Sequence, residues 1–259
     1  MSSIKEVDAN YNILSIQVSL DGFSFLVKNE LSQETVFIHN IGLPQQASPQ
    51  IALVKLEQCF KDVVELQQKF KKVTVVYSNE LYTLVPAALF DKDKLTDYLK
   101  YSIKLLKDDF IVYDEISQFD LINVYVPYAN LNNFFFDRFG SFTYYHGVTL
   151  LLQKVLGHNS NGATLAALAK KTSFDLVITK GSDLQLANTF DYQAPEDFAY
   201  HILFCIEQLQ LDPEKIMLRL YGAIEPDGEI FDLLYKYIRN VELIVEETQN
   251  SPTFLLENT

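Results

Sequence analysis

The feature that most constrains the fold is an order of predicted elements that occurs twice along the chain. Alternating apolar and polar residues predict three strands in the first half, at 13–19, 23–28 and 35–39. The same patterning predicts three strands in the second half, at 163–169, 174–179 and 184–189. Each set is followed by a long amphipathic helix that begins at a proline, Pro49 or Pro195. Both halves then continue strand, helix, strand, so we infer an architectural duplication and an α/β fold of two βββαβαβ domains.

The domain boundaries follow from a stretch rich in Gly, Asn and Ser at 157–162, which is typical of a linker. We expect a first domain at 1–157 and a second domain at 158–259. The first domain is longer because it carries an extra segment, predicted as an inserted subdomain at about 73–118. Within it, Leu95, Leu99, Ile103 and Leu106 share one helical face and predict a helix over 91–106. From Glu246 onward we expect a polar tail that frays.

Charge and composition exclude several classes of protein. The formal net charge is −13, so the chain repels nucleic-acid backbones and anionic lipid surfaces, and we expect neither as a partner. The first ten residues lack an apolar core, and no apolar run approaches the ~20 residues of a membrane span, which favours a cytoplasmic protein. Cys59 and Cys205 lie in apolar helical patterns and are predicted to be buried free thiols. The four histidines, at 39, 146, 158 and 201, have no metal-ligand spacing.

Several segments resemble a known family. They are Leu14–Phe25 (LSIQVSLDGFSF), Asn188–Phe190 (NTF), Pro195–Phe204 (PEDFAYHILF) and Glu207–Leu209 (EQL). These segments are similar to DUF3822, a Bacteroidetes family of unknown function. The resemblance implies a ribonuclease H-like, actin-like ATPase fold, the architecture of actin, sugar kinases and Hsp70. It implies no activity.

The first predicted hairpin turn keeps part of what a phosphate site needs. In the superfamily that the chain resembles, this turn carries an acid and a glycine, because a carboxylate organises Mg²⁺ and a bare backbone approaches phosphate closely. Ser19, Gly22 and Ser24 are present, but Asp21 directly precedes the glycine, whereas the superfamily acid stands two residues before it, at Leu20. A shift of one residue in a hairpin turns a side chain to the other face. A plain Asp-Gly turn explains the same residues.

The other two turns retain less. The second hairpin turn, 169–174, has no Asp and no Gly, although Lys170, Lys171 and Thr172 could contact an anion. A third turn places Gly222 where the superfamily receives a nucleoside, but the residues after it are acidic. Among these, Asp227 is interpreted as the N-cap of a helix over 227–238.

Two hypotheses follow. The first is a non-catalytic binding or scaffolding module with an unidentified protein partner and no bound cofactor, because the acids and glycines of both phosphate turns are incomplete. The second is a protein that still binds a nucleotide such as Mg-ATP, or a phosphorylated small ligand, between its domains, with weak ATPase activity as its strongest form. The candidate binding residues of the second hypothesis are Ser19, Asp21, Gly22, Ser24, Lys170, Lys171, Thr172 and Gly222. No catalytic or metal-ligating residue is assigned.

Overall fold

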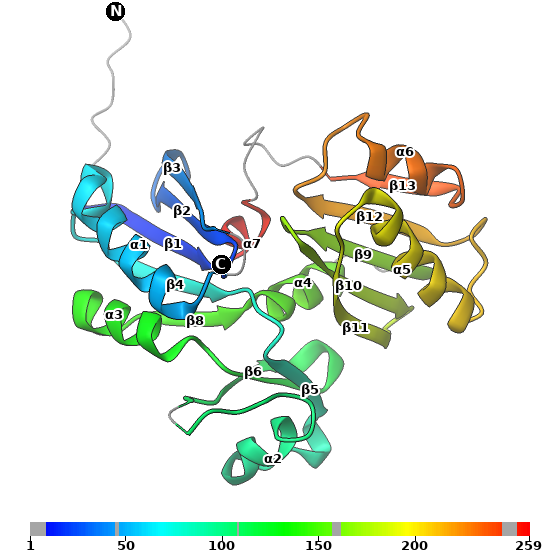
Figure 1. The fold of residues 1–259 in the computed structure, drawn as a ribbon, viewed down its shortest axis with the longest axis horizontal. Coiled ribbons are helices and arrows are strands. Elements are labelled where there is room, and N and C mark those ends of the chain that lie inside the picture. The colour runs from blue at the N-terminus through cyan, green and yellow to red at the C-terminus, as the bar shows by residue number, and fades with distance from the viewer. Residues whose placement is uncertain (1–8, 45–46, 108, 157–161, 245–252) are drawn as a thin grey trace, which may run out of the picture.

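Two five-stranded sheets of identical topology form the body of the molecule (Figure 1). The structure is a computed structural model that describes residues 9–44, 47–107, 109–156, 162–244 and 253–259. The first sheet has the order β3-β2-β1-β4-β8. Its strands are β1 Asn12–Val18, β2 Gly22–Asn29, β3 Thr35–Gly42, β4 Lys72–Tyr77 and β8 Thr143–His146. The second sheet has the order β11-β10-β9-β12-β13. Its strands are β9 Ala163–Ala169, β10 Ser173–Lys180, β11 Asp183–Asp191, β12 Met217–Gly222 and β13 Asn240–Leu243.

The pairing within each sheet confirms the duplicated fold. In both sheets the first three strands form an antiparallel meander, the fourth strand pairs in parallel with its first strand, and the fifth pairs in parallel with the fourth. Parallel neighbours require crossover connections, which the helices between them supply. The predicted βββαβαβ order is therefore the order observed in each copy.

Helices cover the sheets and are specified by local sequence. In the first domain, α1 (Pro49–Asp62) and α3 (Ala129–Phe139) lie side by side against the sheet (Figure 1). In the second, α5 (Pro195–Gln208) and α6 (Glu229–Tyr235) do so. Ser48 caps α1 as predicted, since its hydroxyl accepts a hydrogen bond from the amide of Ile51 at 3.4 Å. The 3₁₀ helices are η1 Ala9–Tyr11, η2 Val64–Leu66, η3 Ala87–Leu89, η4 Lys92–Lys94 and η5 Ser117–Phe119.

The start of α6 corrects one prediction. Asp227 is not the N-cap, because its backbone has φ 62° and the helix begins two residues later, with Gly228 as the preceding residue. The predicted range of 227–238 is also too long, since the helix ends at Tyr235. The left-handed conformation at Asp227 turns the chain before the helix starts, a role that Asp and Asn tolerate better than most residues.

The inserted elements form a separate small layer. They are the strands β5 (Tyr82–Pro86), β6 (Val112–Ile116) and β7 (Leu121–Tyr125) in the order β5-β7-β6, with α2 (Leu95–Leu99). This corrects the sequence-based bounds of 73–118, because β4 pairs in parallel with β1 in the first sheet, whereas β7 belongs to the insertion. Alternation alone does not tell which sheet a strand joins.

The predicted helix over 91–106 is mostly absent. Only 92–99 is helical, as η4 followed by α2, and the chain then turns. Leu106 is 65% exposed, so it does not extend the buried face that Leu99 begins. The apolar spacing matched a helical period, but Ile103 packs against the core of the insertion from a segment that is not helical.

A third hydrophobic core joins the two domains. The helix α4 (Gly147–Leu156) carries buried Leu151 and its neighbours into a cluster that contains residues of both sheets. Val76 of β4 represents the first sheet there, and Leu168 of β9 and Tyr221 of β12 represent the second. The domains therefore share apolar surface that is removed from water, which resists separation.

The end of the chain is part of this core, contrary to the predicted frayed tail. The helix α7 (Phe254–Glu257) lies between the two domains (Figure 1). Phe254, Leu255 and Leu256 are each at most 2% exposed. The ring of Phe254 lies 4.6 Å from that of Tyr221 in the second domain, while α7 packs against β1 and β2 of the first. The residues from 246 to 252 and the predicted linker at 157–161 lie outside the described residues, so the domain boundary near 157 stays a prediction.

Two further expectations concern single residues and membrane spans. Cys59 and Cys205 are free and buried, as predicted. Burial raises the pKa of both thiols, to about 11 for Cys59. Among the helices of the described residues, none combines the length and apolar character that a membrane crossing requires.

Candidate functional site

The first hairpin turn, between β1 and β2, is closed by its own serine. The hydroxyl of Ser19 accepts hydrogen bonds from the amides of Asp21 and Gly22, both at 3.1 Å. The amide of Ser19 donates to the carbonyl of Gly22 at 3.0 Å. Leu20 packs against the first core, and Ser24 is buried within β2. The amides of Asp21 and Gly22, which a phosphate would need, are thus already bonded within the turn.

The second hairpin turn, between β9 and β10, neutralises its own lysine. The ammonium of Lys170 lies 2.8 Å from Oδ1 of Asp175, and the two side chains are 10% and 2% exposed. The same carboxylate oxygen accepts the hydroxyl of Thr189 at 2.7 Å, and the carbonyl of Lys170 accepts the hydroxyl of Tyr192 at 2.6 Å. Lys170 therefore serves a buried ion pair inside its own domain and offers little charge to a ligand.

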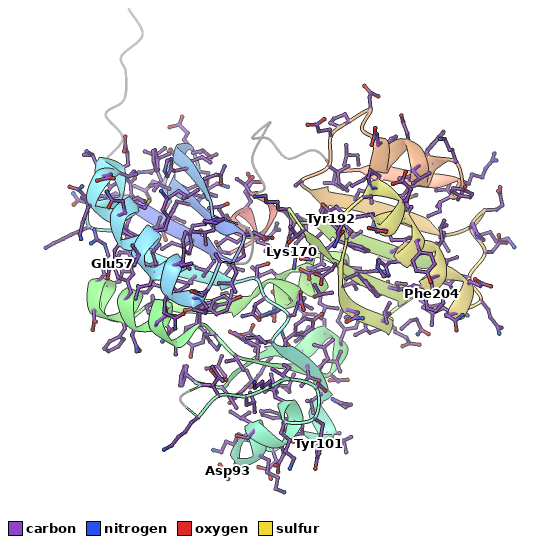
Figure 2. All side chains as sticks on the ribbon, viewed as in Figure 1. Glu57, Asp93, Tyr101, Lys170, Tyr192 and Phe204 are labelled. Carbon is purple, nitrogen blue, oxygen red and sulfur yellow. The ribbon has the colours of Figure 1, made fainter. Side chains whose placement is uncertain are left out.

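The two turns meet across the domain boundary. The hydroxyl of Thr172 lies 3.2 and 3.1 Å from the two carboxylate oxygens of Asp21 and donates to them. Figure 2 places Lys170, beside this contact, on the side of the second domain that faces the first. The Asp21 carboxylate is thus held by a residue of the opposite turn.

The two predicted glycines are needed for packing within the chain. A Cβ at Gly22 would lie 2.2 Å from the carbonyl oxygen of Ile41, and a Cβ at Gly222 would lie 2.4 Å from that of Ala169. Gly222 also has φ +81°, which disfavours any residue with a side chain. In each case the bare backbone approaches another strand of the same sheet, so these contacts explain both glycines without a ligand.

Two hollows border the pair of turns, and we call them the apolar compartment and the polar compartment. The apolar compartment has a volume of about 290 Å³ and includes Phe23, Ile41, Leu168, Phe254 and Leu255 in its lining. The polar compartment has a volume of about 770 Å³ and includes Ser78, Glu80, Tyr128, Asp191 and Tyr192. Both are lined by Ser19, Asp21, Lys170 and Lys171. The inter-domain cleft therefore exists and is built from parts of both domains.

The structure brings most of the predicted residues to these hollows. Gly22 and Ser24 line the apolar compartment, and Thr172 lines the polar one. Gly222 lines neither, although its neighbour Ala223 lines the apolar compartment. The prediction that these loops converge is consistent with this geometry, while their role as a ligand site stays a prediction.

Sequence reasoning missed the acids that decide the charge of the site. Asp175 interrupts the apolar residues that run from Phe174 to Ile178 in β10, five residues after Lys170, and that spacing could have indicated the buried ion pair. Glu80 follows β4 in the first domain and Asp191 ends β11 in the second, and no local pattern links them. Loss of solvent raises the pKa of Glu80, and the nearby Asp191 raises it further.

A buried polar cluster anchors the insertion beside the cleft. The carboxylate of Asp114 in β6 accepts hydrogen bonds from the Tyr125 hydroxyl at 3.0 Å, the His146 amide at 2.8 Å and the Thr149 hydroxyl at 2.7 Å. Burial raises the pKa of Asp114 to about 6, although these three donors oppose the shift. The cluster links β6 to β8 and α4 and therefore serves the fold.

His146 is neutral in this cluster. Its Nδ1 accepts the amide of Val148 at 3.2 Å, so its Nε2 carries the proton and donates to the carbonyl of Asn79 at 3.1 Å. Burial lowers the pKa of His146 to about 4. Within the described residues, no group of three or more His, Cys, Asp or Glu side chains could hold a metal ion.

Comparison with known proteins gives the family. The model of the family described as "Protein of unknown function (DUF3822)" matches residues 2–241. The chain belongs to the DUF3822 family. No curated protein shows a significant match to the DUF3822 chain.

Solved structures show the fold of this DUF3822 protein. A Bacteroides thetaiotaomicron protein described as having an actin-like ATPase fold and unknown function aligns with a TM-score of 0.85 at 19% identity, over 99% of this chain and 98% of that one. A structure of the PilM-PilN type IV pilus biogenesis complex aligns with a TM-score of 0.64 at 11% identity, over 94% and 96%. The ethanolamine utilization protein EutJ from Carboxydothermus hydrogenoformans aligns at 0.54 and 6%, over 94% and 88%. The actin-like ATPase fold is thereby established.

Proposed function

We propose that this protein is a non-catalytic binding module built on the actin-like fold. The observation that carries the proposal is the bond between the two hairpin turns, because Asp21 accepts Thr172 where a nucleotide site needs both turns to face a polyphosphate. The buried pair of Lys170 and Asp175 removes one of the two lysines from ligand binding. Mg-ATP does not fit these residues well, and we derive no reaction for it.

The charge of the cleft and the shared core also support a binding role. Carboxylates of Asp21, Glu80 and Asp191 line the polar compartment, and they repel a triphosphate. The apolar core around α4 and α7 holds the domains together, whereas hydrolysis in such folds is coupled to domain closure around a ligand. One structure of the same fold was solved as the PilM-PilN complex, which supports a protein as the partner class.

The proposal is tested with Mg-ATP. Isothermal titration of the purified protein should give no binding tighter than about 1 mM, corresponding to about −4 kcal/mol, and phosphate release should equal that of the buffer. Micromolar binding, or turnover that disappears in Asp21→Ala, would refute the proposal and favour the alternative of a nucleotide or phosphorylated ligand in the cleft. Thr172→Val is the matched variant, because it frees Asp21 without removing the acid.

A further inference from the structure

The polar compartment carries more negative than positive charge. Its lining contains the charged residues Asp21, Glu80, Asp191, Lys170 and Lys171. The charge of Lys170 is balanced by Asp175 behind it, which leaves Lys171 against three carboxylates. The whole chain adds to this field with a net charge of −13. A cation is therefore attracted to the compartment and an anion is repelled.

Two of these carboxylates come from different domains. Glu80 follows β4 of the first domain and Asp191 ends β11 of the second, yet both line the polar compartment, where burial and the nearby Asp191 raise the pKa of Glu80. Such a pair shares a proton or repels. A positively charged donor between the two carboxylates would replace that repulsion by two charge-assisted hydrogen bonds.

A buried hydroxyl beside this acid pair also lacks a partner. Ser78 is 5% exposed and lines the polar compartment. Among the described residues, none forms a hydrogen bond with its Oγ. A buried polar atom without a partner is unfavourable, and a donor on a ligand would satisfy it.

Aromatic rings complete the chemistry of a cation site. Tyr128 of the first domain and Tyr192 of the second both line the polar compartment. Figure 2 shows Tyr192 on the part of the second domain that faces the first. Aromatic faces attract ammonium and guanidinium groups, and they do so together with carboxylates at such sites.

We propose that the polar compartment binds the guanidinium or ammonium group of an arginine or lysine side chain on a protein partner, an inference that rests on the proposed binding function. The absence of a three-ligand metal cluster among the described residues favours an organic cation over a metal ion. A protein segment is favoured over a free polyamine because the apolar compartment adjoins the polar one at Ser19 and Asp21. A segment with a basic and an apolar side chain can fill both, whereas a polyamine is charged along its length.

The test uses small probes and an NMR titration of the full-length protein. The probes are the blocked dipeptide acetyl-Arg-Leu-amide, its neutral isostere acetyl-citrulline-Leu-amide, spermidine and MgCl₂. We expect the arginine dipeptide to shift the amides of Ser78, Glu80 and Asp191, and to bind at least about fivefold more tightly than the citrulline dipeptide and spermidine.

Matched variants separate the site from general charge. The double variant Glu80→Gln with Asp191→Asn should bind the arginine dipeptide about tenfold more weakly than the wild type. The control, Glu115→Gln with Asp183→Asn, removes two exposed carboxylates outside the compartment and should leave affinity unchanged. Ser78→Ala should weaken binding without lowering Tm, because the hydroxyl has no partner to lose within the described part of the fold.

Each contrary result overturns the inference separately from the proposed function. Equal binding of the citrulline dipeptide, no binding of the arginine dipeptide, or equal losses in the control variant would remove the cation site. Tighter binding of spermidine would assign the site to a free polyamine, and binding of Mg²⁺ that depends on Glu80 and Asp191 would assign it to a metal. In all these cases the module remains non-catalytic unless Mg-ATP also binds.

Discussion

The two hairpin turns occupy the same place in two copies of one topology, yet they manage charge in opposite ways. In the first turn, the carboxylate of Asp21 is partly exposed and is held by Thr172 of the other domain. In the second turn, Lys170 is nearly buried and is held by Asp175 of the strand that follows the turn, β10. The shared topology repeats the backbone path, but the side chains decide what each turn can bind.

The glycines beside these turns are explained by packing within the two sheets. Gly22 and Gly222 stand at different positions in their sheets, yet each presses against a carbonyl of a neighbouring strand. A glycine that permits close approach is needed for sheet packing as much as for a phosphate. The following predictions test how far the two turns differ.

The largest difference is expected between the two acids. Asp175→Ala leaves the Lys170 ammonium buried without its partner and should lower the free energy of unfolding by about 3–5 kcal/mol. Asp21→Ala removes a partly exposed acceptor of Thr172 and should cost only about 1–2 kcal/mol. Urea unfolding at pH 7 measures both, and equal losses would show that the two turns are held alike.

A second contrast concerns a glycine near each turn. Gly222→Ala places a Cβ 2.4 Å from the carbonyl oxygen of Ala169 at φ +81°, and should cost about 2–4 kcal/mol. Gly42→Ala is the control, because a Cβ there meets nothing within 4 Å, and it should change stability by less than about 0.5 kcal/mol. Thermal unfolding of the two variants distinguishes them, and a stable Gly222→Ala would contradict the packing role.

Asp114 is a buried acid that accepts neutral donors, whereas Asp175 pairs with a lysine. The folded-state pKa of Asp114 is about 6, above the value of 3.8 for a free side chain, so the folded protein binds this proton more tightly. Its contribution to stability is therefore present at low pH and is lost as pH rises from about 4 to 6, by about 3 kcal/mol. Asp114→Asn cannot take up this proton. Its free energy of unfolding should therefore fall by about 3 kcal/mol relative to that of the wild type as pH drops from 7 to 4.

The buried His146 titrates in the same range with the opposite sign. Its folded pKa of about 4 lies below the ordinary 6.5, so the unfolded chain takes up this proton first, and the stability that the neutral ring contributes is lost as pH falls from about 6.5 to about 4. His146 is present in both proteins, so the difference in their unfolding free energies isolates Asp114. A difference that does not change with pH would mean that Asp114 is already ionised at low pH.

The smallest effect is expected for the bond that joins the turns. Thr172→Val removes the hydroxyl that donates to Asp21 and should cost about 1 kcal/mol. Thr172→Ser keeps the hydroxyl and should recover most of the loss. If Val and Ser cost the same, the methyl group of Thr172 and not its hydrogen bond holds the turns together.

Much of the fold could be predicted from local patterns. The order of strands and helices followed from alternation, from helical stripes and from prolines at the first helical position, because these signals lie within ten to fifteen residues of each other. The DUF3822 segments supplied the actin-like arrangement. The assignments that proved wrong depended on distant partners: β4 joined β1, and α7 was buried although the sequence before it is polar.

The candidate site was predictable only in part. The residues of the two hairpin turns could be proposed because turns at equivalent places of a duplicated sheet converge. The charges of Glu80 and Asp191 could not be predicted, because they matter only through neighbours that are far away in sequence. The spacing of five residues between Lys170 and Asp175, by contrast, is a local signal.

The sequence by itself determined the duplicated βββαβαβ order, since hydrophobic periodicity and turn residues act over short distances along the chain. Only the tertiary structure decided that Thr172 bonds Asp21 and that the cleft between the domains is acidic. Hydrogen bonds and ion pairs depend on separations of a few ångströms, and residues about 150 positions apart reach such separations only when both domains pack together.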